Sequence, residues 1–254
     1  MILTVDIGNT NITLGGYIDG KISFISRLAT DIRRTGDQYA VEIYDVMRLS
    51  GFSPAEIEGS IICSVVPTVG TEMSKAIEKL IGIKPLMIGP GVKTGVDIKI
   101  DHPSQLGADL VAGAAGTLKK YPLPCIIIDM GTATTLFVLN ENGAFIGGAI
   151  AAGVNLTLNA LSKNTAQLPL VPVEAPKKAI GSNTVECMQS GLVFGTAAMI
   201  DGLIERLEAE VGMPCFAVAT GGKASQIIAH CKKEITLDEN LLLDGLYYIY
   251  GKNI

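Results

Sequence analysis

The chain of 254 residues has no tryptophan, only two histidines and few charges, since 18% of its residues are Asp, Glu, Lys or Arg. Its net charge is −5, and no basic block occurs in it. Proteins that bind nucleic acid normally present a basic patch, so nucleic acid is excluded as a main partner. His102 and His230 are too isolated in the sequence to suggest a zinc cluster.

Cysteine is sparse, and its pattern excludes the usual cysteine chemistry. The five cysteines are scattered without a C-x-x-C pair, and four lie in apolar segments, so we expect buried thiols rather than disulfides or metal ligands. No window approaches the roughly 18 consecutive apolar residues that a membrane span needs. The first residues show neither the charged region nor the cleavage site of a targeting peptide. We therefore expect a soluble cytoplasmic protein without a membrane partner.

Two segments share one pattern, Asp6-Ile-Gly-Asn-Thr-Asn11 and Asp129-Met-Gly-Thr-Ala-Thr-Thr135. Each follows an apolar strand and runs into a second apolar stretch, which ends at Asp19-Gly20 in the first copy and at Asn142-Gly143 in the second. Asp-Gly and Asn-Gly are strong signals for a hairpin turn. In both copies the glycine of this turn lies 14 residues after the aspartate. The matched spacing indicates an internal duplication, and hence two domains.

An Asp-x-Gly turn at the end of a strand is suited to holding phosphate. Glycine permits close approach of the backbone, so that N–H groups and Thr or Asn side chains can point at phosphate oxygens. The aspartate can hold a cation or the water around Mg²⁺. Two such turns predict a site for a polyphosphate, with contacts from Asp6, Gly8, Asn9, Thr10 and Asn11 in the first copy and from Gly131, Thr132 and Thr134 in the second.

A third element follows the strand predicted near 215–220, which ends in Thr220-Gly221-Gly222 before a helix. Such a segment leaves a surface free of side chains, against which an adenine ring or a ribose can lie. Taken alone it is equally typical of an ordinary strand-to-helix turn. After two Asp-x-Gly turns, it favours ATP as the ligand.

The segment 104–115 predicts a helix rich in small residues, in which Asp109 is the dominant polar side chain. One interpretation is that this aspartate complements the helix dipole in the first turn. The other is that it acts as a general base on the hydroxyl of a substrate, as in kinases of several folds. We favour the base.

The order of predicted elements is that of a mixed α/β protein. Three strands connected by hairpins are followed by alternating helices and strands, and the second half repeats this order. We predict two domains, 1–115 and 116–254. The predicted strands are 2–5, 12–18, 22–29, 60–65, 85–88, 125–128, 134–139, 144–151 and 215–220, and the predicted helices are 36–49, 71–80, 104–115, 155–161 and 185–207.

Taken in order, these motifs resemble those of the type III pantothenate kinases over nearly the whole chain. Further matching segments are Ser64-Val-Val-Pro67, Gly107-Ala-Asp109, Gly147-Gly-Ala-Ile150, Ile180-Gly-Ser-Asn-Thr184, Gln189-Ser-Gly191 and Ala219-Thr-Gly-Gly222. That family belongs to the acetate-kinase/sugar-kinase/Hsp70/actin superfamily. The resemblance implies an α/β fold of two tandem ribonuclease-H-like domains, the first being 1–115 and the second 116–254.

The resemblance also implies an activity and its components. The family transfers phosphate from ATP to the primary hydroxyl of pantothenate, giving 4′-phosphopantothenate for coenzyme A synthesis. It needs Mg²⁺ and commonly a monovalent cation, K⁺ or NH₄⁺, and it forms homodimers with the active site at the subunit interface. By resemblance Asp109 is the catalytic base, and Asp6 is a metal and phosphate ligand. The resemblance also implies that Asp129 is a ligand of the monovalent cation, and that Gly107 and Thr184 contact the substrate.

The chain departs from the family pattern at two positions of the expected acceptor site. The family continues Gly-x-Asp with an Arg that pairs with the pantothenate carboxylate, and it carries a Tyr nine residues before that Asp. Here these positions hold Leu110 and Ile100, and leucine cannot replace the charge or the donors of a guanidinium. Either pantothenate remains the substrate and His102, Arg33 or Arg34 supplies the cation, or the chain is a paralogue that phosphorylates an alcohol without a carboxylate.

A further alternative is a regulatory protein that keeps the fold and has lost turnover. Asp6, Asp109 and Asp129 are all present, whereas a degenerate site is expected to lose at least one of them. The residues therefore favour an enzyme, an ATP-dependent phosphotransferase with an alcohol acceptor.

Overall fold

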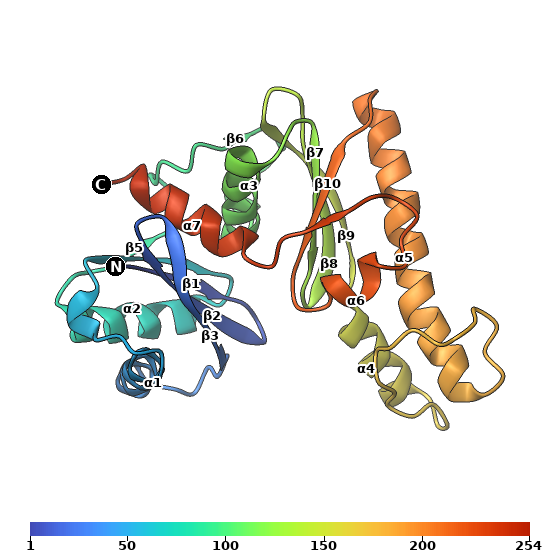
Figure 1. Ribbon diagram of the computed structural model, residues 1–254, viewed down its shortest axis with the longest axis horizontal. Helices are drawn as coiled ribbons and strands as arrows, with labels where there is room; N and C mark the ends of the chain where they lie inside the picture. The colour runs from blue at the N-terminus through green and yellow to red at the C-terminus, as the bar shows by residue number, and fades with distance from the viewer. The chain divides into compact units, whose positions relative to one another are not determined.

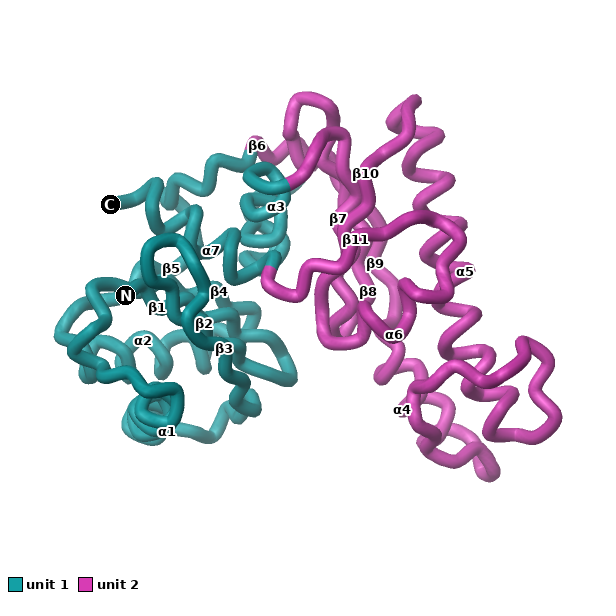
Figure 2. The backbone as a smooth tube through the Cα atoms, viewed as in Figure 1, with its two compact units in different colours: residues 1–96, 102–120, 241–254 teal, residues 97–101, 121–240 magenta.

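Two β-sheets organise the chain, and each contains the antiparallel meander that the duplicated pattern predicts (Figure 1). The computed structural model describes all residues, 1–254, and divides them into two compact units (Figure 2). Unit 1 comprises 1–96, 102–120 and 241–254, and unit 2 comprises 97–101 and 121–240.

The sheet of unit 1 has five strands in the order β3-β2-β1-β4-β5. The first three strands are antiparallel neighbours, while β4 pairs parallel to β1 and β5 parallel to β4. Asp19 and Gly20 both have positive φ, as a two-residue hairpin turn requires. The strands are β1 Ile2–Ile7, β2 Asn11–Ile18, β3 Lys21–Ala29, β4 Gly59–Ser64 and β5 Leu86–Met87.

Helices cover the sheet of unit 1 on both faces. Leu3, Val5 and Ile7 of β1 pack with residues of α1 and α2, whereas Thr4 and Gly15 face Leu243 of α7. The helix α1 has the predicted bounds because Thr35 and Gln38 form a capping box at its start. The helices of this unit are α1 Gly36–Leu49, α2 Pro67–Ile81, α3 Ala108–Lys120 and α7 Leu241–Gly251, with short 3₁₀ turns at Pro54–Glu56 and Pro103–Gln105.

The sheet of unit 2 has six strands in the order β11-β10-β7-β8-β9-β6. Its meander is β7-β8-β9, and β10 pairs parallel to β7. The core of this unit lies between the sheet and α4, α5 and α6. The elements are β6 Asp97–Ile98, β7 Cys125–Met130, β8 Ala133–Leu139, β9 Ala144–Ala152, β10 Phe216–Thr220, β11 Thr236–Leu237, α4 Val154–Asn164, α5 Thr184–Val211 and α6 Ala224–Ile228.

The long helix α5 is the one helix with the length and apolarity of a membrane span. Its buried residues, among them Ile200 and Ile204, belong to the core of unit 2 together with residues of β7 and β8. The sheet of unit 2 therefore accounts for the apolar face of this helix.

The compact units differ from the predicted division into 1–115 and 116–254 at residues 97–101, 116–120 and 241–254. The C-terminal helix α7 packs against α3 and against the strands β1 and β4, so it belongs to the unit formed by the N-terminal residues. The sequence did not predict this helix. The boundary between 115 and 116 stays a prediction about the two duplicated halves.

Candidate active site

The first Asp-x-Gly turn joins β1 to β2 in unit 1. The Gly8 N–H donates to the Asn11 carbonyl oxygen over 3.0 Å, which closes the turn. Thr30, just after β3, supports it twice, since its hydroxyl donates to the Gly8 carbonyl over 2.7 Å and its N–H to the Thr10 carbonyl over 3.0 Å. Asn9, Thr10 and Asn11 are exposed. The turn thus presents polar side chains on a fixed backbone, as phosphate binding requires.

The charges of Asp6 and Asp109 both act on one buried thiol in unit 1, that of Cys63. Cys63 of β4 is the register partner of Asp6 on β1, so the two side chains lie on the same face of the sheet. Burial first, and then the charges of Asp6 and Asp109, raise the pKa of the Cys63 thiol well above its usual range. The thiol is therefore protonated. No sequence motif reveals this neighbour of Asp6, because the two residues are 57 positions apart.

Asp109 stands in the first turn of α3, because this helix begins at Ala108 and not at the predicted residue 104. Its Oδ1 accepts a hydrogen bond of 2.8 Å from the Leu110 N–H. Gly107 makes room for this carboxylate, because a Cβ at that position would lie 2.4 Å from Oδ1. Burial raises the pKa of Asp109, against the lowering effect of the backbone N–H groups. A half-buried carboxylate with a raised pKa is suited to accepting a proton.

The second Asp-x-Gly turn joins β7 to β8 in unit 2, and there it meets the predicted Thr-Gly-Gly segment. Asp129 is the register partner of Thr220 on β10. Gly221 has a φ of +94°, and a Cβ on it would lie 2.7 Å from Asp129 Oδ1. The two segments are thus side by side, and only glycine fits between them. Gly222 follows with open space around it.

The helix α4 begins directly behind this second turn. The Gly153 N–H donates to the Thr132 carbonyl oxygen over 3.1 Å, and a Cβ on Gly153 would lie 2.3 Å from that oxygen. No side chain caps the N-terminus of α4. Gly131 and Thr132 are exposed, whereas Thr134 is fully buried and its Oγ1 has no hydrogen-bond partner. Gly131 and Thr132 are therefore accessible to a ligand, whereas the side chain of Thr134 is not.

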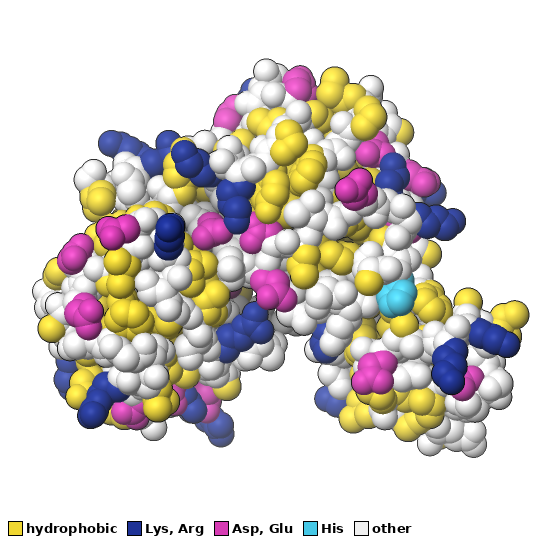
Figure 3. Space-filling view, viewed as in Figure 1, with side chains coloured by type: hydrophobic (Ala, Val, Ile, Leu, Met, Phe, Trp, Pro, Cys, Tyr) yellow, Lys and Arg dark blue, Asp and Glu magenta, His cyan; other side chains and the backbone are white.

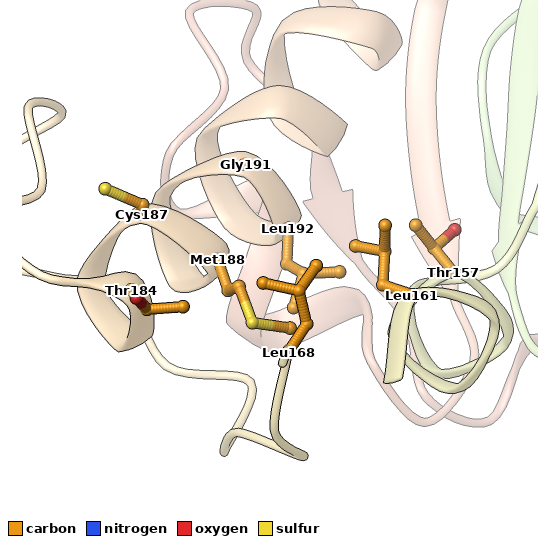
Figure 4. A pocket seen from close by; sticks show the side chains of 8 residues that line it. All are labelled: Thr157, Leu161, Leu168, Thr184, Cys187, Met188, Gly191 and Leu192. Carbon is orange, nitrogen blue, oxygen red and sulfur yellow. The ribbon is translucent and has the colours of Figure 1, made fainter. Parts of the chain in front are cut away.

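Thr184, the predicted substrate contact, begins α5 and lines an apolar pocket of about 520 Å³ in unit 2 (Figure 4). The pocket lies between α4 and α5, and none of the three candidate aspartates lines it. Its lining consists of Thr157, Leu161, Leu168, Thr184, Cys187, Met188, Gly191 and Leu192. Cys187 is exposed, so the expectation of buried thiols is wrong for this cysteine, and Cys215 and Cys231 are only partly buried. Cys63 and Cys125 are buried, as predicted.

The two departures from the family pattern fall in different units. Ile100 belongs to unit 2 and Leu110 to unit 1, and both are half-buried. A shared acceptor pocket stays a prediction. Of the alternative cations, Arg33 is paired with Asp31 through two hydrogen bonds of 3.0 Å, and Arg34 is paired with Glu42.

The carboxylate ligands of this site suit a metal ion that binds together with a nucleotide. No group of three or more His, Cys, Asp and Glu side chains is placed to hold a metal ion by itself. Mg²⁺ is commonly bound through one or two carboxylates together with substrate phosphates and waters. The single carboxylate of Asp6, next to the exposed turn, fits this mode. Figure 3 shows basic and acidic side chains interspersed on the face in view, without a continuous basic surface.

Solved structures define the class of fold. A protein from Campylobacter jejuni, described as a Baf family transcriptional activator, is similar to this chain with a TM-score of 0.63 at 17% identity, covering 99% of this chain and 98% of that one. Component A of the (R)-2-hydroxyglutaryl-CoA dehydratase of Acidaminococcus fermentans gives a TM-score of 0.56 at 15% identity, covering 98% and 96%. At such identities the likeness shows the fold alone, which is that of two tandem ribonuclease-H-like domains, as predicted.

Sequence comparison identifies the family within this class. The profile of the type III pantothenate kinase family matches residues 2–206. The type III pantothenate kinase of Myxococcus xanthus is 38% identical over 253 residues, covering 100% of this chain and 99% of that protein. That of Roseiflexus castenholzii is 40% identical over 253 residues, with the same coverage. The chain belongs to the type III pantothenate kinase family.

Proposed function

We propose that this chain transfers the γ-phosphoryl group of ATP to the primary hydroxyl of pantothenate, giving 4′-phosphopantothenate for coenzyme A synthesis. The full-length similarity to type III pantothenate kinases carries this proposal. The site agrees with it, because each unit holds an Asp-x-Gly turn and unit 1 holds a half-buried aspartate suited to act as a base. None of the comparisons favours a paralogue with another acceptor or a protein without turnover.

Asp109 is the base of the proposed reaction. The Leu110 N–H fixes its Oδ1, so the carboxylate is oriented before the substrate binds. As the hydroxyl oxygen bonds to the γ-phosphorus, the bond from that phosphorus to the β,γ-bridging oxygen breaks and ADP leaves. The hydroxyl proton passes to Asp109. Mg²⁺, when bound with ATP near Asp6, would neutralise charge on the phosphates.

The first experiment is a product assay with matched acceptors. The chain is incubated with Mg·ATP and pantothenate, with pantothenol, which has a hydroxyl in place of the carboxylate, or with no acceptor. We expect 4′-phosphopantothenate by mass spectrometry, one ADP per product, and preference for pantothenate. Preference for pantothenol would instead favour the paralogue suggested by Leu110 and Ile100. ADP formation at the same rate with and without either acceptor would contradict both the pantothenate kinase and the paralogue.

We infer that the second turn holds the monovalent cation, with Asp129 as its ligand. The support is the position of its Oδ1 beside the backbone of Gly221 and Met130 in the second turn. Activity should then rise when Na⁺ is replaced by K⁺ or NH₄⁺ at constant ionic strength, and Asp129→Asn should lose that response. Equal activity in all three salts would contradict the assignment.

We also propose that the chain is a homodimer of the cytoplasm. The surface around the pocket of unit 2 carries large apolar side chains that are 37% to 88% exposed, namely Leu156, Leu161, Leu170, Ile180 and Val185. Exposed apolar surface of this kind commonly marks a protein interface. Sedimentation should give about twice 26.6 kDa, and Leu161→Glu with Val185→Glu should shift the protein toward monomer. A monomeric, fully active wild type would contradict the dimer.

A further inference from the structure

Thr30 is a polar side chain beside the first Asp-x-Gly turn to which the proposed reaction gives no role. The turn, residues 8–10, lies between β1 and β2 and outside the ladder that pairs these strands. Thr30 is the first residue after β3. Its hydroxyl donates to the Gly8 carbonyl oxygen over 2.7 Å, and its N–H donates to the Thr10 carbonyl oxygen over 3.0 Å. One residue therefore holds both ends of the turn.

These two hydrogen bonds orient the peptide groups of the turn. A trans peptide group is planar, so its N–H points opposite to its carbonyl, and the turn contains no cis peptide bond. The Gly8 carbonyl is directed at Thr30, so the Asn9 N–H points away from it. The Thr10 carbonyl is directed the same way, so the Asn11 N–H also points away from Thr30. Backbone N–H groups held in a turn in this way form the concavities that bind anions.

The position of Thr30 is itself fixed from the helix α1. Tyr39 of that helix is fully buried, and its hydroxyl donates to the Asp31 carbonyl oxygen over 2.9 Å and accepts from the Asp31 N–H over 3.3 Å. Asp31 follows Thr30 directly, so the backbone is restrained by β3 before Thr30 and by α1 after it. The β-branched side chain of threonine is also limited in its rotation. The hydroxyl of Thr30 is therefore a donor of defined position.

We propose that Thr30 is a positioning residue for nucleotide binding, whose hydroxyl holds the first Asp-x-Gly turn in the form that receives the phosphates of ATP. The inference rests on the proposed function, because it takes ATP to be the ligand of that turn. It concerns the backbone of the turn, so the effect should not depend on Mg²⁺. A side chain that keeps the hydroxyl should serve, whereas one of the same shape without it should not.

The test compares Thr30→Val, which keeps the shape and loses the hydroxyl, with Thr30→Ser, which keeps the hydroxyl. Thr4→Val is the matched control. Thr4 lies on β1 of the same unit, is fully buried, and donates its hydroxyl to the Gly15 carbonyl oxygen over 3.1 Å. This variant therefore also loses one bond from a hydroxyl to a carbonyl, but away from the turn. Calorimetry without an acceptor measures the dissociation constant of ATP with Mg²⁺ and with EDTA, and thermal unfolding measures the Tm.

The hydroxyl and the general stability of the fold should have separate effects. We expect Thr30→Val to weaken ATP binding about threefold to tenfold, both with Mg²⁺ and with EDTA, in line with the loss of one neutral hydrogen bond. Thr30→Ser and Thr4→Val should bind ATP within about twofold of the wild type. Thr4→Val should nevertheless lower the Tm at least as much as Thr30→Val, because the carbonyl that it leaves without a donor is buried.

Several outcomes would overturn the proposal. They are wild-type affinity in Thr30→Val, equal losses in Thr30→Val and Thr30→Ser, a loss confined to Mg²⁺, and an equal loss in Thr4→Val. Should Thr30→Val fail to fold, Thr30→Ala and Thr30→Ser, which are of similar size, isolate the same hydroxyl. A wild type that binds no ATP would overturn the proposed function and this inference together. Failure of the wild type to phosphorylate pantothenate would count against the proposed function alone, because nucleotide binding is measured without an acceptor.

Discussion

Gly245 of α7 lies against the carbonyl oxygen of Ala112 of α3, so closely that a Cβ at 245 would stand 1.9 Å from that oxygen. One turn further along α3, a Cβ on Gly116 would lie 2.4 Å from the Leu241 carbonyl oxygen. The two helices are therefore in direct backbone contact. Since Asp109 stands at the start of α3, the last helix of the chain supports the helix that carries the proposed base.

Gly245→Ala should destabilise the protein and lower kcat. In a helix without neighbours, alanine is favoured over glycine by about 1 kcal/mol. Here the contact with Ala112 makes the substitution destabilising instead, because overpacking typically costs about 1–3 kcal/mol. Gly251→Ala, in the same helix with nothing within 4 Å, is the control and should be neutral or slightly stabilising. Thermal unfolding of both variants checks the pair, and a Gly245→Ala protein as stable as the control would contradict the contact.

Asp109→Asn should stabilise the folded protein at neutral pH. Burial raises the pKa of Asp109 in the folded state, so its stability contribution is fully present below the unfolded pKa and is lost as pH rises through the folded one. Asparagine carries no charge at this position, so the variant does not lose that stability as the pH rises. The gain in Tm over wild type should be largest at pH 7 to 8 and shrink toward about pH 4, where an ordinary aspartate protonates. Asp45→Asn, at an exposed site on α1, provides the control, and a constant difference at all pH values would argue against the burial effect.

Gly221→Ala should disrupt the second turn through two effects. Its φ of +94° is unfavourable for alanine, and the added Cβ would lie 2.7 Å from both Asp129 Oδ1 and the Met130 backbone. We expect a loss of about 1–3 kcal/mol of stability and a smaller response of activity to K⁺. For stability alone, Gly222→Ala is the matched comparison, since nothing lies within 4 Å of it. Denaturant unfolding of the two variants should separate them clearly.

The local features were predictable from the sequence, while contacts across the fold were not. The helix 36–49 was predicted at both ends, and the residues that cap its start, Thr35 and Gln38, are neighbours in sequence. The two meanders were predicted because their turns carry Asp-Gly and Asn-Gly at matched spacing. The turns differ in detail, since φ is positive at both Asp19 and Gly20 but only at Gly143 in the second copy.

The helix α7 and the thiol of Cys63 were missed for physical reasons. Residues 241–251 include five leucines or isoleucines, three tyrosines and two glycines, and this composition lacks the polar face and the capping signals that mark a surface helix. Gly245 is explained only by the close approach of α3. Cys63 is beside Asp6 through strand register, which the order of residues does not reveal.

Asp6→Ala should weaken the binding of Mg·ATP while leaving binding in EDTA nearly unchanged. The physical reason is the loss of the carboxylate assigned to the metal beside the exposed turn. Asp19→Ala is unsuitable as a control because Asp19 has a positive φ of 49°, so exposed Asp45 serves again. Calorimetry with both nucleotide forms provides the measurement, and equal weakening in Mg²⁺ and EDTA would place Asp6 outside the metal site.

The central claim, that Asp109 is the base of an ATP-dependent pantothenate kinase, is tested most directly by steady-state kinetics of Asp109→Asn. Loss of a general base typically lowers turnover by about 10²–10⁴-fold, while the dissociation constant of Mg·ATP should stay near that of the wild type. We predict that kcat with pantothenate falls by this factor in Asp109→Asn. A variant that turns over pantothenate at nearly the wild-type rate would contradict the account.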